Sequence, residues 1–136
     1  MTDPRTAVVV GTGLVGGSVG LALRGAGWYV VGVDRDPGRA EAALARGAID
    51  EIGMPRACEL AVVATPVSSI AAVTTELLEA GAAVVTDVGS VKGPLVAVVD
   101  DPRFVPGHPM AGNEQEGLEG ADADLFRGAV WVLTPT

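Results

Sequence analysis

The sequence is poor in the residues that build disulfide scaffolds and metal centres. Its 136 residues include one cysteine, Cys58, and one histidine, His108. A single cysteine forms no internal disulfide, and one cysteine with one histidine is too few for a zinc site. The acidic residues do not follow the spacing of a calcium-binding loop. We therefore expect no metal site.

Positive charge is also scarce. Nine Lys and Arg residues stand against 17 Asp and Glu residues, which gives a net charge of −8, and Lys92 is the only lysine. This balance argues against nucleic-acid binding, which needs clustered cations. No apolar run approaches the roughly 20 residues of a membrane helix, and the start, MTDPRTAVVV, lacks a secretory-signal pattern. We therefore expect a cytoplasmic protein without nucleic-acid or membrane partners.

Hydrophobic residues are abundant, at 49% of the chain, which is enough for one packed domain of this length. Short β-branched runs alternate with segments of helical spacing, a pattern typical of βαβ units. The predicted fold is α/β: a doubly wound, mostly parallel Rossmann sheet in the order 3-2-1-4-5-6, with helices on both faces. Strands are expected at residues 6–10, 28–34, 48–52, 60–65, 82–88, 103–107 and 129–135. Helices are expected at 14–26, 37–46, 66–80 (with Thr65 as N-cap) and 91–99.

A glycine pattern follows the first predicted strand. In VVVGTGLVGGSVG, Gly11, Gly13 and Gly16 form G-x-G-x-x-G between a strand and a helix. Gly11 permits the tight turn, Gly13 lets the backbone approach a pyrophosphate, and Gly16 lets helix and strand pack closely. The N–H groups of Leu14 and Val15 open the helix and would face the phosphates. The alternative is a purely structural turn.

Asp34 ends the second predicted strand, where an acid can accept hydrogen bonds from the adenosine ribose. It would repel a 2′-phosphate, so NAD is the expected cofactor rather than NADP. Arg35 leaves an ambiguity, because an arginine there could contact a phosphate. A plain turn residue is the other interpretation of Asp34.

Distinctive residues follow the later strands as well. Because the carboxyl ends of parallel strands share one edge, where ligands bind in open α/β sheets, we expect these residues to meet there. Thr65 and Pro66 follow the fourth strand, Asp87, Ser90 and Lys92 the fifth, and His108 the sixth. We expect the first three to contact the cofactor.

Ser90, Lys92 and His108 each have a simpler interpretation as well. Ser90 could cap the following helix, Lys92 could bind an anion or be solvated, and His108 could be an ordinary loop histidine.

Several stretches together resemble one family. They are GTGLVGGSVGLAL, VDRD, GAIDE, VVATPV, VTDVGSVKG, PGHPMAGNE and ADADLFRGAVWVLTPT. The chain is similar to the prephenate/arogenate dehydrogenase family of tyrosine biosynthesis. The resemblance implies NAD-dependent oxidative decarboxylation of prephenate to 4-hydroxyphenylpyruvate, or of arogenate to tyrosine.

The resemblance also implies residue roles. His108 corresponds to the residue that accepts the proton of the substrate ring hydroxyl, and it must be neutral to do so. Ser90 matches a serine that orients this histidine or touches the hydroxyl, and Glu114 matches an acid at the mouth of the site. Asn113 stands where the family usually has Ser or Thr, and the pair 115–116 also departs from the family. These differences leave the choice of prephenate or arogenate open, and Lys92 is carried as a substrate-region residue.

Members of the family normally continue into a helical domain that forms a homodimer and supplies arginines for the substrate carboxylates. We therefore expect this chain to be the cofactor domain alone, with little or no activity by itself. Two other interpretations stay open: another NAD-dependent dehydrogenase of the β-hydroxyacid type, and a non-catalytic NAD-binding module.

Overall fold

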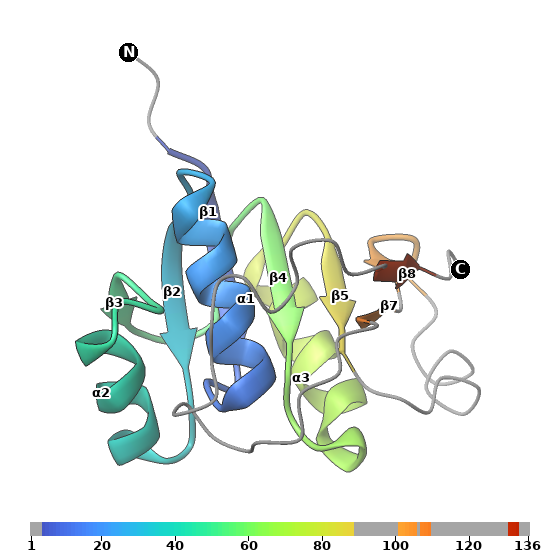
Figure 1. Cartoon of the computed structure of the whole chain (residues 1–136). Coiled ribbons are helices and arrows are strands. Elements are labelled where there is room, and N and C mark those ends of the chain that lie inside the picture. The colour runs from blue at the N-terminus through green and yellow to red at the C-terminus, as the bar shows by residue number, and fades with distance from the viewer. Residues whose placement is uncertain (1–3, 89–100, 106, 110–130, 134–136) are drawn as a thin grey trace.

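The protein is described by a computed structural model over residues 4–88, 101–105, 107–109 and 131–133. Six parallel strands form one open sheet in the order β3-β2-β1-β4-β5-β6, which confirms the predicted order (Figure 1). The strands are β1 (Thr6–Val10), β2 (Tyr29–Val33), β3 (Glu51–Ile52), β4 (Leu60–Val63), β5 (Val85–Asp87) and β6 (Phe104–Val105). The helices are α1 (Leu14–Gly25), α2 (Pro37–Ala45) and α3 (Val67–Ala80).

The central strand β1 is buried on both faces. Val8 and Val10 pack with Ile70 of α3, whereas Val9 packs on the opposite face with Val19 of α1 and Ala43 of α2. Two buried faces explain why the run TAVVV shows no alternation of polar and apolar residues. The core therefore consists of two layers of side chains, one on each side of the sheet. None of the described helices is both long and apolar enough to cross a membrane.

Several strands and helices are shorter by a few residues than the sequence predicts. The strand predicted at 48–52 is paired only at Glu51–Ile52, and that predicted at 82–88 only at Val85–Asp87. Ala48 and Ile49 are instead buried in the core layer beside α1 and α2. The helix predicted at 14–26 ends at Gly25, and Gly27 follows with φ of 93°.

The predicted cap of the third helix is wrong by one residue. Pro66, not Thr65, occupies the N-cap position, and α3 begins at Val67. The Thr65 hydroxyl makes no capping bond, and it has no hydrogen-bond partner in the part of the chain that is described. Proline at the N-cap offers no side-chain acceptor, so the first N–H groups of α3 are not capped by a side chain.

The predicted sixth strand divides into two. β6 ends at Val105, and Gly107 belongs to β7 (Gly107–Pro109), which pairs antiparallel with β8 (Trp131–Leu133) in a separate two-stranded sheet. Pro106 separates the two strands in the sequence and has no N–H to donate to a ladder. The seventh strand expected at 129–135 is therefore present as β8, but outside the parallel sheet. The helix expected at 91–99 lies outside the described residues.

Thr74 of α3 gives a test of the core. It is fully buried, and its hydroxyl has no hydrogen-bond partner among the described residues. An unsatisfied buried hydroxyl costs about 1–3 kcal/mol. Thr74→Val is expected to raise the free energy of unfolding in urea by about 1 kcal/mol. A loss of stability would show that the hydroxyl does make a bond in solution.

Candidate functional site

The turn between β1 and α1 is built around glycine. Gly11 has φ of 91°, and a Cβ atom there would lie 2.5 Å from the carbonyl oxygen of Ala64. A Cβ atom at Gly16 would lie 1.7 Å from the carbonyl oxygen of Gly11. Neither position accepts a side chain unless the backbone shifts, so both glycines hold α1 close to the sheet.

Gly13 differs from the other two glycines of the motif. A Cβ atom at Gly13 would meet no atom of the described residues within 4 Å, and Gly13 is the N-cap of α1 with no side-chain capping bond. The first N–H groups of α1, which include those of half-buried Leu14 and Val15, have no acceptor within the helix. This arrangement fits an anionic group at the helix N-terminus, where backbone donors and the helix dipole favour negative charge.

Asp34 follows β2 and is tied to this turn. Its Oδ2 accepts hydrogen bonds from the backbone N–H of Thr12, at 2.8 Å, and from the Thr12 hydroxyl, at 2.9 Å. Its Oδ1 accepts one from the backbone N–H of Asp36 at 2.9 Å. The turn is joined to β2 once more by the N–H of Gly11, which donates to the carbonyl of Val33 at 2.7 Å.

Electrostatics keep the Asp34 carboxyl ionised. Partial burial by itself would raise the pKa of Asp34, but the hydrogen bonds from Thr12 and Asp36 and the positive charge of Arg39 outweigh it and lower the pKa below its ordinary value. An ionised carboxylate only accepts hydrogen bonds, as a site for sugar hydroxyls requires. Arg35, beside it, is exposed.

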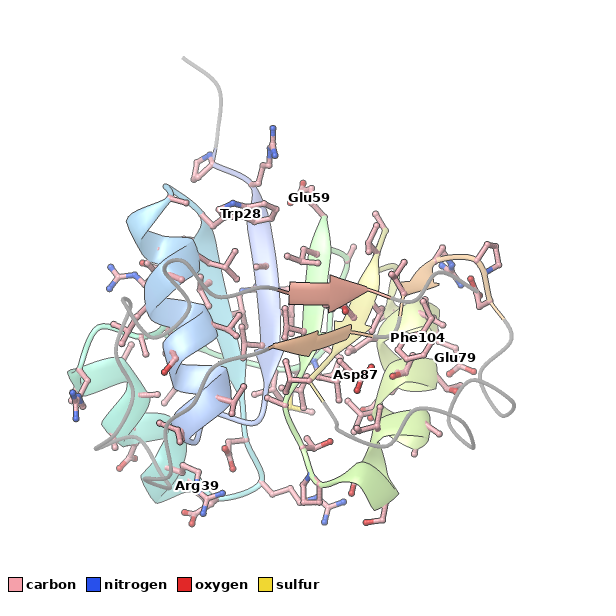
Figure 2. The ribbon with its side chains drawn as sticks, turned by 45° about the vertical axis from the view of Figure 1, so that its right-hand side comes forward. Trp28, Arg39, Glu59, Glu79, Asp87 and Phe104 are labelled. Carbon is pink, nitrogen blue, oxygen red and sulfur yellow. The ribbon has the colours of Figure 1, made fainter. Side chains whose placement is uncertain are left out.

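Strand register brings the other strand ends to the same edge. Val10 of β1 pairs with Val33 of β2 and Val63 of β4, and Val63 pairs with Asp87 of β5. Asp87 is fully buried at the end of its strand. Figure 2 shows Asp87 and Arg39 toward this edge, while Trp28 and Glu59 lie at the opposite edge. Just beyond β4, Pro66 is exposed and the Thr65 hydroxyl is buried without a partner in the described segments.

The backbone of His108 lies close to this edge. His108 occupies the middle of β7, opposite Val132 of β8, and β7 contacts β5 (Figure 1). The other predicted catalytic residue, Ser90, lies outside the described residues, as do Lys92, Asn113 and Glu114. The structure thus places the predicted cofactor residues at one edge of the sheet, and β7, which carries His108, contacts β5 of that sheet. Among the described residues, no group of His, Cys, Asp or Glu is placed to hold a metal ion.

Thr12 is the residue that the sequence analysis missed. It is fully buried and donates twice to Asp34, although it occupies a variable position of the glycine pattern. One signal for it was present. Gly32 lies two residues before Asp34 in an otherwise bulky strand, and a small residue there makes room for a neighbouring side chain.

A comparison with protein-family models matches residues 19–136 to the prephenate dehydrogenase nucleotide-binding domain. The chain belongs to this family. Prephenate dehydrogenase from Bacillus subtilis is 35% identical over 145 residues, an alignment that covers 96% of this chain and 39% of the relative. The alignment with this relative therefore covers nearly all of this chain.

Solved structures of an arogenate dehydrogenase and a prephenate dehydrogenase also match this chain. Synechocystis arogenate dehydrogenase matches with a TM-score of 0.84 and 34% identity, over 96% of this chain and 50% of that one. A. aeolicus prephenate dehydrogenase, solved in complex with hydroxyphenyl propionate and NAD+, matches with a TM-score of 0.88 and 32% identity, over 99% and 52%. The chain thus spans about two fifths of the curated relative and half of each structural one.

Proposed function

We propose that this chain binds NAD+ and forms the cofactor part of a prephenate or arogenate dehydrogenase. The observation that carries the proposal is the ionised carboxylate of Asp34, fixed by three hydrogen bonds beside the glycine turn. The family and the A. aeolicus relative solved with NAD+ support it. A carboxylate at this place suits an unmodified ribose and disfavours a 2′-phosphate.

Each cofactor residue has a role in this proposal. The open N-terminus of α1 at Gly13, Leu14 and Val15 binds the pyrophosphate, and Gly11 and Gly16 give the turn its shape. Asp34 accepts a hydrogen bond from the adenosine ribose, with Arg35 exposed at its side. Thr65 and Pro66 border the crevice between the first and fourth strands, and Asp87, fully buried, lies at the same edge at the end of β5.

The chemistry proposed for the substrate side concerns a proton. Bound NAD+ supplies the hydride acceptor. His108 accepts the proton of the substrate ring hydroxyl, Ser90 orients the imidazole or the hydroxyl, and loss of CO2 leaves the ring aromatic. The place of β7 against β5, at the carboxyl end of the sheet, supports a role for His108 in this crevice.

The proposal also includes the substrate region and the assembly of the complete protein. We propose that Lys92, Asn113 and Glu114 lie in the substrate region, and that the complete protein is a homodimer whose further helical part contributes to the site. This chain covers 39% of the curated relative and 50% of the Synechocystis structure, and the further length of these relatives supports this part of the proposal. Steady-state rates of the complete protein with prephenate and with arogenate distinguish the two substrates.

Cofactor choice tests the proposal. Titration of the complete protein is expected to give a Kd for NADP+ about tenfold or more above that for NAD+, because the 2′-phosphate meets the Asp34 carboxylate. Asp34→Asn should reduce this ratio. Asp36→Asn is the matched control, since the side chain of Asp36 caps α2 and asparagine caps a helix equally well. Tighter binding of NADP+ to the wild-type protein would overturn the assignment of Asp34.

A further inference from the structure

The side chain of Thr12 is held in one orientation. Thr12 is fully buried, and a Cβ atom at Gly32 would lie 3.2 Å from its γ-methyl carbon and 2.5 Å from Cδ1 of Ile49. Any larger residue at position 32 would therefore press on both side chains. The methyl group lies over Gly32, and the hydroxyl faces Asp34, two residues further along the chain.

The hydrogen bonds to Asp34 are divided unequally between its two oxygens. Oδ2 accepts from both the N–H and the hydroxyl of Thr12, and Oδ1 accepts from the N–H of Asp36. A carboxylate offers about four acceptor positions, two on each oxygen. Oδ2 is therefore filled by Thr12, and about one position remains, on Oδ1.

We infer that Thr12 is a positioning residue for the cofactor: by filling Oδ2, it turns Oδ1 of Asp34 outward to accept from a single ribose hydroxyl. Apart from the half-turn that exchanges its two equivalent oxygens, rotation of the carboxylate would break at least one of the two bonds from Thr12. The inference rests on the proposed binding of NAD+. It adds a specificity-determining residue that the glycine pattern and the acid do not reveal by themselves.

Three variants of the complete protein test the inference. Thr12→Val keeps the methyl group but removes the hydroxyl, and we expect the Kd for NAD+ to rise about tenfold while kcat at saturating NAD+ is unchanged. Thr12→Ser restores the hydroxyl and should return the Kd to within about twofold of wild type. Thr74→Val is the matched control, since it removes another buried threonine hydroxyl far along the chain in α3 and should leave the Kd unchanged.

A double-mutant cycle shows whether Thr12 acts through Asp34. In an Asp34→Ala background, Thr12→Val should no longer raise the Kd for NAD+. A rise of the same size there, or no rise in the wild-type background, would overturn the inference. Thermal unfolding of each variant is recorded in parallel, and Thr12→Ala replaces Thr12→Val if the latter does not fold.

A different result would contradict the proposed function itself. If the wild-type protein does not bind NAD+, the proposed function is wrong whatever the variants do. If it binds NAD+ and Thr12→Val binds equally well, only the role of Thr12 is wrong.

Discussion

Gly16→Ala is expected to destabilise the fold by about 1–3 kcal/mol or more and to abolish NAD+ binding. The new Cβ atom would lie 1.7 Å from the carbonyl oxygen of Gly11 and 2.8 Å from its carbonyl carbon. Both are backbone atoms, so α1 must move away from the sheet, and overpacking of this kind costs about 1–3 kcal/mol or more. Urea unfolding gives the loss of stability, and titration with NAD+ gives the loss of binding.

Two glycines at the ends of α1, Gly13 and Gly25, serve as controls. A Cβ atom added at Gly25, the last residue of α1, would meet nothing within 4 Å in the part of the chain that the structure describes. Gly25→Ala should leave stability unchanged or raise it by about 0.5 kcal/mol. The methyl group of Gly13→Ala would also meet no described atom within 4 Å, so this variant should keep the fold. The methyl group would enter the region proposed for the pyrophosphate and weaken NAD+ binding. Equal stabilities of Gly16→Ala and Gly25→Ala would show that the turn relaxes without cost.

His108→Asn is expected to lower kcat of the complete protein by about 10²–10⁴, the range typical of a lost general base. Asparagine keeps a polar side chain of similar reach but does not exchange a proton near neutral pH. The Kd for NAD+ should change little, because the proposed role of His108 concerns the substrate hydroxyl. Formation of NADH with prephenate, followed over a range of pH, measures the effect.

The same variant separates the three functions that the sequence leaves open. A non-catalytic NAD-binding module predicts no effect of His108→Asn on any rate, and a β-hydroxyacid dehydrogenase predicts turnover of hydroxy acids rather than prephenate. A kcat within a few-fold of wild type, with prephenate as substrate, would show that another group accepts the proton.

Much of the fold could be predicted because the signals were local. The β-branched run at 6–10 forms β1 with the predicted bounds, and Pro37 after Asp36 marks the start of α2 as expected. The predicted strand bounds were wrong where pairing with a neighbouring strand decided which residues form the strand. Ala48 and Ile49 look like the start of a strand, but they are buried as core residues, and only Glu51–Ile52 pairs with β2.

The order of the sheet, the family and the positions of Gly11, Gly16 and Asp34 follow from the amino-acid sequence, because they depend on hydrophobic periodicity and on residue types at fixed spacing. The tertiary structure was needed to show which groups donate hydrogen bonds to Asp34, and that Thr12 donates both of its bonds to one oxygen. It was also needed to show that β7 lies outside the parallel sheet and pairs with β8. Hydrogen bonds between segments distant in sequence depend on strand register and on the space beside Gly32, and no local pattern encodes either of these.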